Sequence, residues 1–211
     1  MGAFSVGPSA ADITVRPAVR RDLVRLAAQL ARASEQDPVV DWLLPRRTGR
    51  RERLRLLFRG TARSELLDLG GIDVACDGSR LAGGALWFPP GTWPPPIGRR
   101  LRSVPYQLRA LGTHVLRGQR LAEAGARVHP PEPHWFLLTV GVDPLYQGLG
   151  IGAKLLRNRL DQADREREPV YLECGNPANL PLYEHFGFTL ADPVPLPPGA
   201  PDVVGMWRPA A

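Results

Sequence analysis

The sequence has little of several features that would assign it to common classes of protein. It contains two cysteines, Cys76 and Cys174, which lie far apart and without the spacing of a zinc site. We therefore expect a reduced, cytoplasmic protein that binds no metal. No apolar run approaches the ~18 residues that a membrane span requires, and residues 1–11 lack the basic-then-apolar layout of a signal peptide. We expect no membrane partner and no secretion.

Lysine is nearly missing as well. Of the 27 basic residues Lys154 is the single lysine, and 21 acidic residues are interspersed among the arginines. The net charge of +6 and the pI of 10.1 are typical of proteins that bind nucleic acid. The arginines form no continuous stripe, however, and the abundance of Ala, Pro and Arg resembles a GC-rich coding bias. We therefore expect no nucleic-acid partner, although a basic surface helps to attract a polyanionic ligand.

Length and hydrophobic periodicity predict one α/β domain over residues 12–211, after a flexible N-terminus at residues 1–11. Strands are expected at 13–17, 72–76, 81–88, 135–142, 170–173, from 188, and at 203–207. Helices are expected at 19–34, 51–69, 151–167 and 179–186, with irregular helix over 98–125. Asp37-Pro38 is expected to break the chain after the first helix. The helix at 151–167 joins two strands that must run parallel.

The most informative stretch is residues 140–152, which read Val-Gly-Val-Asp-Pro-Leu-Tyr-Gln-Gly-Leu-Gly-Ile-Gly. An apolar strand ends there, glycines follow at alternate positions (Gly148, Gly150 and Gly152), and a helical pattern then begins. Glycine lets the backbone turn sharply and leaves bare N–H groups beside a helix N-terminus, where a phosphate or pyrophosphate binds. The stretch therefore predicts a phosphorylated ligand.

A dinucleotide-binding fold is the first rival interpretation. Gly148, Gly150 and Ala153 satisfy its G-x-G-x-x-A fingerprint, and Glu173 stands where the ribose-binding acid would be. Residues 143–147 separate the strand from the glycines, however, and too few residues follow Gly152 to complete a doubly wound sheet. A P-loop is excluded because no Gly-Lys-Ser/Thr follows the glycines.

Two motifs in register resemble the GNAT superfamily of N-acetyltransferases. Gln147-Gly-Leu-Gly150-Ile-Gly152 is similar to the Q/R-x-x-G-x-G/A acetyl-CoA signature of that family. Residues 179–188, with Asn179, Tyr183 and a closing Gly-Phe, resemble its second hallmark, one helix and one strand further along. The resemblance covers residues 132 to 208 well. Within that range the chain is similar in particular to puromycin N-acetyltransferase and its relatives.

The resemblance implies the fold and the way the donor binds. The fold would be a mixed, mostly antiparallel sheet, splayed in the middle, with helices on both faces. Acetyl-CoA would be the cosubstrate, and its pantetheine arm would pair with the strand end Val140, Gly141 and Val142 and with Asn179. Its pyrophosphate would be held by the backbone of Gln147, Gly148, Leu149, Gly150, Ile151 and Gly152. Gly141 suits a bulge or a close backbone approach.

The resemblance also implies the groups that carry out the reaction. Tyr183 would donate a proton to the departing thiolate, and a base would remove a proton from the incoming ammonium. Glu173 is our first candidate for that base, followed by His134 and His185; the alternative for each of these residues is an ordinary structural role. A cysteine nucleophile is not required, and Cys174 is expected to be a packed side chain.

The acceptor is expected to be a primary amine on a small molecule. The alternatives are a protein or peptide amine, or a module that binds acyl-CoA without catalysis, against which the complete motif argues. Puromycin is only one possible acceptor, because residues 35–130 match the family loosely. Trp93, in a proline-rich segment, is expected either to pack on the hairpin or to line the substrate entrance. A homodimer is plausible by family habit.

Overall fold

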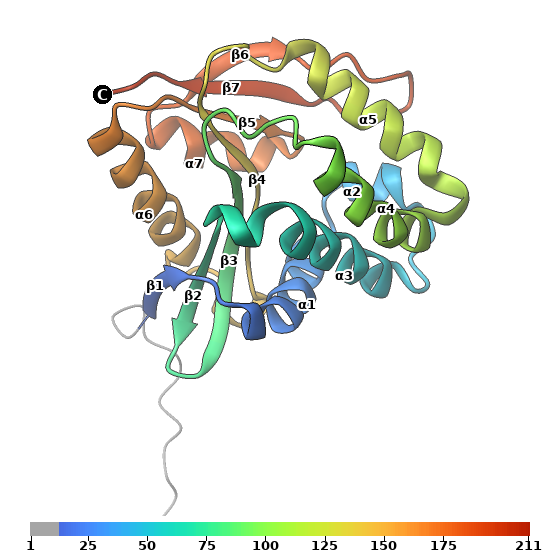
Figure 1. Ribbon diagram of the computed structural model, residues 1–211, viewed down its shortest axis with the longest axis horizontal. Helices are drawn as coiled ribbons and strands as arrows, with labels where there is room; N and C mark the ends of the chain where they lie inside the picture. The colour runs from blue at the N-terminus through green and yellow to red at the C-terminus, as the bar shows by residue number, and fades with distance from the viewer. Residues whose placement is uncertain (1–12) are drawn as a thin grey trace, which may run out of the picture.

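A single mixed sheet organises the structure, a computed structural model that describes residues 13–211; the segment 1–11, expected to be flexible, lies outside them. The sheet has seven strands in the order β1-β2-β3-β4-β5-β7-β6 (Figure 1). The strands are β1 Ile13–Pro17, β2 Ile72–Asp77, β3 Arg80–Phe88, β4 Trp135–Val142, β5 Val170–Cys174, β6 Thr189–Pro193 and β7 Val204–Arg208. All neighbours are antiparallel except β4 and β5, which are parallel as expected.

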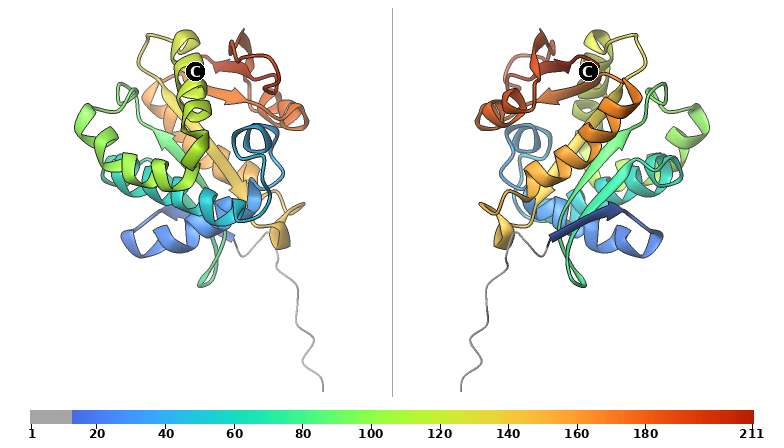
Figure 2. Two further views of the ribbon diagram at one scale, coloured as in Figure 1. Left: turned by 90° about the vertical axis from the view of Figure 1, so that its right-hand side faces the viewer. Right: turned by 90° about the vertical axis from the view of Figure 1, so that its left-hand side faces the viewer.

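Helices cover both faces of the sheet (Figure 2). They are α1 Leu23–Ala33, α2 Pro38–Leu43, α3 Arg50–Thr61, α4 Ile97–Leu111, α5 Val115–Val128, α6 Ile151–Glu166 and α7 Leu180–His185. Helix α6 and α7 pack on one face, whereas α1 packs on the other and carries α3 against it. The expected mixed, mostly antiparallel sheet with helices on both faces is thus confirmed. Within residues 13–211, no helix is both long and apolar enough to span a membrane.

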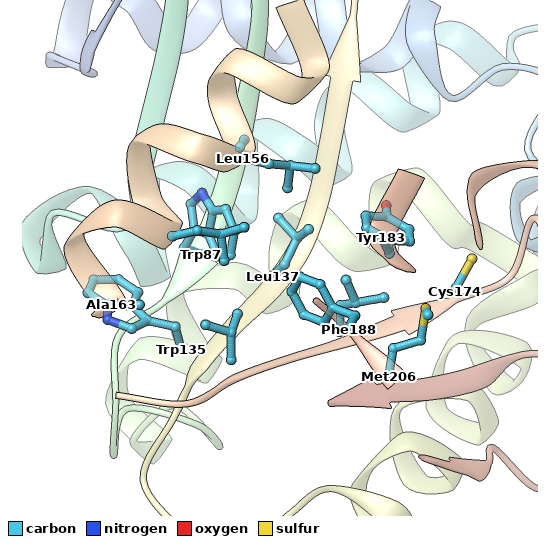
Figure 3. Packing of buried hydrophobic residues seen from close by; sticks show 13 residues of the cluster. Trp87, Trp135, Leu137, Leu156, Ala163, Cys174, Tyr183, Phe188 and Met206 are labelled. Atoms are coloured by element: carbon cyan, nitrogen blue, oxygen red, sulfur yellow. The ribbon is translucent and has the colours of Figure 1, made fainter. Parts of the chain in front are cut away.

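Strand β3 shows how alternation divides the core. Ala85 and Trp87 face α6 and join a cluster that includes Leu156 (Figure 3). Leu86 and Phe88 face α1 on the other side. Successive side chains of a strand point to opposite faces, so one apolar run supplies both cores. The sequence of such a strand is apolar at nearly every position because the strand is buried on both faces.

A buried ion pair fixes α6 on the sheet. The Arg159 guanidinium donates to the Asp73 carboxylate at 3.0 Å and to the Gly70 carbonyl at 3.1 Å, and it lies 4.4 Å from the centre of the Trp135 ring. The two charged side chains are 6% and 1% exposed. Because either charge alone would be costly to bury, this pair specifies where α6 meets β2.

The segment at Asp37-Pro38 differs from expectation. We expected it only to break the first helix, but it also begins α2. The Asp37 carboxylate accepts hydrogen bonds from the N–H groups of Val39 at 2.9 Å and Val40 at 3.3 Å. Aspartate at the N-cap and proline in the first turn both favour a helix start, so the same two residues end one helix and begin the next.

The sheet opens between β4 and β5. The two strands pair only from Trp135 to Leu137, and beyond that point β4 follows β3 while β5 continues beside β7. Leu138 has no partner in β3, because the register passes from Trp87–Leu137 to Leu86–Thr139. Such a bulge bends a strand, so β4 turns away from β5 and leaves a gap.

Candidate functional site

A glycine turn joins the end of β4 to the start of α6. The Asp143 carboxylate accepts a hydrogen bond from the Leu145 N–H at 3.1 Å and holds a short 3-10 turn. Gly148 and Gly150 then adopt φ of +80° and +70°, a left-handed conformation that favours glycine. A Cβ at either position would meet no atom within 4 Å, so the backbone conformation rather than crowding accounts for these glycines.

The turn is anchored on the side of the sheet. The Asp143 N–H donates to the Ala82 carbonyl in β3 at 2.8 Å, and the Asp143 carboxylate pairs with Arg32 of α1. The Tyr146 hydroxyl donates to the Asp77 carboxylate at 2.9 Å. These contacts attach the turn to β2, β3 and α1, and its opposite side is exposed to solvent.

The N-terminus of α6 offers free backbone donors. The Lys154 N–H donates to the Gly150 carbonyl at 3.0 Å and starts the helical pattern. The three N–H groups before it, at residues 151–153, have no acceptor within the helix. Gln147, Gly148 and Gly150 are exposed beside them. The positive end of a helix with free N–H groups favours an anion such as a pyrophosphate.

A hollow of about 220 Å³ lies against this turn. It is lined by Val142, Tyr146, Gln147, Gly148, Gly150, Ile151, Gly152, Ala153 and, from α7, Leu182. Free N–H donors border it on one side and aliphatic side chains on the other. This combination suits a ligand that carries both a phosphate group and an apolar arm.

The backbone of β4 faces the gap at alternate residues. The backbone N–H and C=O groups of successive residues in a strand point to opposite sides. Because the Asp143 N–H bonds to β3, the backbone groups of Gly141 also point toward β3, and those of Val140 and Val142 point toward the gap. The Gly141 carbonyl also accepts from the Gln29 side chain at 2.9 Å. A Cβ on Gly141 would stand 2.8 Å from that of Ala33, so this glycine permits the close approach of α1, while the bulge lies at Leu138.

Tyr183 is buried beside the gap on α7. Its side chain packs against Phe188 with ring centres 6.0 Å apart and is 7% exposed (Figure 3). Among the residues described, nothing hydrogen-bonds to its hydroxyl. Burial, with smaller contributions from Cys174 and Asp37, raises the pKa of Tyr183, so the phenol is a proton donor at neutral pH. Asn179, at the start of α7, is exposed and makes no capping bond.

Glu173 lies on the opposite face of β5 from Tyr183. Cys174 shares a cluster with Tyr183, and alternation turns Glu173 toward α5. A Cβ on Gly125 of α5 would stand 2.8 Å from one Glu173 carboxylate oxygen, so the carboxylate lies directly beneath that helix. Burial raises the pKa of Glu173 to about 7. A carboxyl group with that pKa exchanges a proton readily near neutral pH.

The other two candidate bases do not face the gap. His134 is 6% exposed at the far end of β4, with its Nδ1 2.6 Å from the Glu132 carbonyl and its Nε2 3.1 Å from Nε2 of His129. His185 is exposed at the end of α7, two residues from Tyr183, so the two side chains diverge around the helix. His134 thus has the surroundings of a buried structural histidine, whereas His185 is exposed.

Trp93 packs near this histidine pair. Its ring centre lies 5.1 Å from that of Phe88 at the end of β3 and 5.3 Å from that of His129. Of its two expected environments, the structure shows packing on the hairpin. A small cavity of about 70 Å³ lies beside the ring, at the end of β4 away from the glycine turn.

Two side chains that contact the end of β4 carried no signal that we recognised in the sequence. Gln29 and Arg32 reach the β4 end from α1, across separations of 112 and 111 residues. Asp37 follows the same helix, and only its N-cap pattern was visible. Within residues 13–211, no three His, Cys, Asp or Glu side chains are grouped to hold a metal ion.

The chain matches known acetyltransferases. The model of the acetyltransferase (GNAT) family matches residues 71–188. An N-acetyltransferase of Schizosaccharomyces pombe (C550.08) is 32% identical over 116 residues, 51% of this chain and 47% of that protein. The N-alpha-acetyltransferase RimI of Mycobacterium tuberculosis is 54% identical over 52 residues, 24% of this chain and 32% of that protein. The chain thus spans less than half the length of these curated relatives.

A solved structure resembles almost the entire chain. A Corynebacterium glutamicum protein, described as histone acetyltransferase HPA2 and related acetyltransferase, superposes with a TM-score of 0.74. It is 28% identical, and the match covers 95% of this chain and 97% of that one. The sheet topology described above is therefore shared over the full fold, including residues 35–130, where the sequence resemblance is loose.

The His129–His134 pair makes the stability of the fold depend on pH. Burial, with a smaller effect of His134, lowers the pKa of His129 to about 3, whereas a histidine in the unfolded chain titrates near ~6.5. The unfolded chain therefore takes up a proton first, so stability is fully present above pH ~6.5 and is lost toward pH ~3. From pH 7 to pH 5 the full effect is ~2 kcal/mol, and partial exposure of the ring reduces our expectation to ~1 kcal/mol.

The test compares urea unfolding of the wild type and His129→Gln at both pH values. The glutamine amide keeps a donor toward His134 but does not titrate. As the pH falls from 7 to 5, the free energy of unfolding should decrease more in the wild type than in the variant. Glu173 acts in the opposite sense, since its raised pKa stabilises the fold as the pH falls, and the comparison cancels that effect. Equal pH dependence in the two proteins would contradict the assignment.

Proposed function

Because this chain belongs to the acetyltransferase (GNAT) family, we propose that it is an N-acetyltransferase that transfers an acetyl group to the primary amine of a small molecule. Acetyltransferases of this family use acetyl-CoA as the donor. The observation that carries the proposal is the gap between β4 and β5, with the glycine turn at its end and the Tyr183 hydroxyl beside it.

The donor binds along the gap. The backbone groups of Val140 and Val142 pair with the pantetheine arm, and the exposed Asn179 side chain hydrogen-bonds to it. The amides from Gln147 to Gly152 hold the pyrophosphate at the start of α6. Gly141 does not bind the donor through its own backbone groups; its missing side chain allows α1 to pack closely against β4. The hollow beside the turn supports this assignment, since aliphatic side chains line it next to the free N–H groups.

The transfer needs one base and one acid. Glu173 accepts a proton from the acceptor ammonium and leaves a nitrogen lone pair. That nitrogen attacks the thioester carbonyl carbon, so a C–N bond forms while the C–S bond breaks. Tyr183 donates its proton to the departing sulfur. The two residues lie on opposite faces of β5, so donor and acceptor reach each other only through the gap.

A peptide N-terminus is the second candidate acceptor. It is favoured by the 54% identity to a segment of the mycobacterial N-alpha-acetyltransferase. A puromycin-like aminated compound is a further member of the small-molecule class. Binding of acyl-CoA without catalysis is the remaining alternative.

Release of CoA distinguishes these functions. The protein would be incubated with acetyl-CoA and a panel of small primary amines, puromycin and short peptides, and free thiol measured. We expect acetyl-CoA to raise the Tm and at least one small amine to release CoA. A Tm shift without CoA release from any acceptor would favour a binding module, and release with peptides alone would favour the second candidate.

Tyr183→Phe tests the acid. Loss of the hydroxyl removes the proton donor but leaves the ring packed on Phe188. We expect kcat to fall about 100-fold, a typical contribution of acid catalysis, while the KM for acetyl-CoA stays nearly unchanged. Equal losses in kcat and in acetyl-CoA affinity would exclude the acid role.

Glu173→Gln tests the base. Because the carboxylate must be ionised to accept a proton, the wild-type kcat/KM should rise with pH through about 7, the pKa that burial gives Glu173. The variant should lack this inflection and lose about 100-fold in rate at its optimum. Retention of the inflection in Glu173→Gln would assign it to another group.

A further inference from the structure

The net charge of this protein comes from one helical segment. Residues 97–122, which span α4 and the first two turns of α5, contain six arginines and no aspartate or glutamate. Subtracting these six from the 27 basic residues leaves 21, which equals the number of acidic residues in the chain. The entire net charge of +6 is therefore gathered in this segment. The six residues are Arg99, Arg100, Arg102, Arg109, Arg117 and Arg120.

This positive charge is not neutralised within the described chain. All the ion pairs between arginine and a carboxylate among residues 13–211 involve other arginines. Arg100, Arg102 and Arg109 are exposed. The charge of Arg100 acts on the carboxylate of Glu65, but that side chain is buried and does not lie on the surface. The segment thus presents an unpaired positive surface, which attracts an anionic partner.

The same segment carries half of the exposed large apolar side chains. Ten such side chains are exposed among residues 13–211, and five of them lie in α4 and the first turn of α5. On α4 these side chains are between 37% and 69% exposed, and their spacing of four, three and four residues places them on one side of the helix. We call them the α4 stripe, which consists of Ile97, Leu101, Val104 and Leu108. A continuous exposed apolar patch marks a contact surface.

The opposite side of α4 already packs against the protein. Ser103 and Ala110 are buried there, and a Cβ on Gly60 of α3 would stand 2.5 Å from that of Tyr106, so the two helices are in close contact. Helix α3 packs in turn on α1, and α1 on the sheet. Helix α4 therefore belongs to an outer layer of the molecule (Figure 2). The α4 stripe is not needed for the core of this chain.

Arginines border the α4 stripe on both sides. With 3.6 residues per turn, Arg100 lies on one side of the stripe, and Arg102 and Arg109 lie on the other. The aliphatic part of an arginine side chain can lie along apolar surface while its guanidinium reaches a phosphate. An apolar stripe bordered by arginines is typical of helices that lie in the surface of an anionic membrane.

We propose that α4 binds an anionic lipid surface. The α4 stripe enters the boundary between headgroups and acyl chains, and the bordering arginines contact the lipid phosphates. The expectation of no membrane partner rested on the lack of a long apolar run, which excludes a helix that crosses a membrane. A helix that lies on the surface needs only apolar residues at helical spacing. This inference goes beyond the proposed function and does not depend on the acceptor or on catalysis.

Other partners fit this surface less well. A second copy of the chain would bring two sets of unpaired arginines together, which like-charge repulsion opposes. A nucleic acid would use the arginines but leave the α4 stripe in water. Protein partners favour aromatic anchors, whereas the stripe is aliphatic and Tyr106 faces α3. A lipid surface satisfies both the arginines and the aliphatic side chains.

The experiment measures binding of the full chain to lipid vesicles by co-sedimentation, without acetyl-CoA or acceptor. One set of vesicles contains phosphatidylglycerol and phosphatidylcholine in equal amounts, and the other contains phosphatidylcholine alone. We expect binding to the anionic vesicles at least about tenfold tighter than to the neutral ones. That binding should weaken as the ionic strength rises, because salt screens the arginines.

Two variants test the two parts of the surface. Leu101→Ser should weaken binding to the anionic vesicles about tenfold, the effect of one leucine side chain that no longer enters the lipid. The double variant Arg100→Gln with Arg102→Gln should weaken it about 30-fold. All three side chains are exposed, so both variants should keep the Tm of the wild type.

Matched controls change the same residue types elsewhere on the surface. Leu190 of β6 is 62% exposed, close to the 61% of Leu101. Arg20 and Arg21 are neighbouring exposed arginines before α1. Leu190→Ser, and the double variant Arg20→Gln with Arg21→Gln, should bind the anionic vesicles as the wild type does.

Several results would overturn the inference. Equal affinity for the two kinds of vesicle, or no binding to either, would exclude an anionic lipid surface as the partner. Wild-type binding by Leu101→Ser would show attraction by charge alone, without entry of the α4 stripe. A dimer in sedimentation velocity that Leu101→Ser dissociates would assign the stripe to a second copy of the chain. The release of CoA is measured without vesicles, so the proposed function stands or fails separately.

Discussion

The parting of β4 from β5 after Leu137 is the constraint on which the rest of this structure depends. The bulge at Leu138 bends β4 toward β3, and β5 loses its neighbour on that side. A sheet paired along its full length would satisfy every backbone group and leave no opening. Here the unpaired backbone of Val140 and Val142 borders the gap, while Tyr183 and Glu173 lie on opposite faces of β5.

Ion pairs with arginine position several elements of this fold. Among residues 13–211, an arginine nitrogen lies within 4.0 Å of seven carboxylates, and the pair Asp73–Arg159 shows how such a contact positions a helix on the sheet. Glu65 and Glu173 have no such partner among these residues. Glu65 is buried, and Glu173 lies beneath α5, where burial raises its pKa to about 7.

Much of the architecture follows from short-range patterns. Apolar alternation located every strand to within a few residues, and helical spacing located α1, α3 and α6. The glycines at 148 and 150 were recognisable because a left-handed backbone needs them. The sequence did not reveal that Asp37 begins a helix, since proline after an acidic residue marks both the end of one helix and the start of another. The surroundings of His134 could not be predicted from the sequence, because the side chains of His129, Tyr171 and Trp207 that form them come from other segments of the chain.

By itself the sequence determined the order of the elements, the turn before α6 and the two motifs that resemble an acetyltransferase, all features encoded by neighbours along the chain. Only the tertiary structure decided that Tyr183 and Glu173 lie on opposite faces of β5 and that His134 is buried at the far end of β4. It also decided that Gly141 serves the approach of α1. The physical reason is distance in sequence: Gln29 and Gly141 are 112 residues apart, and their contact exists only once the sheet has formed.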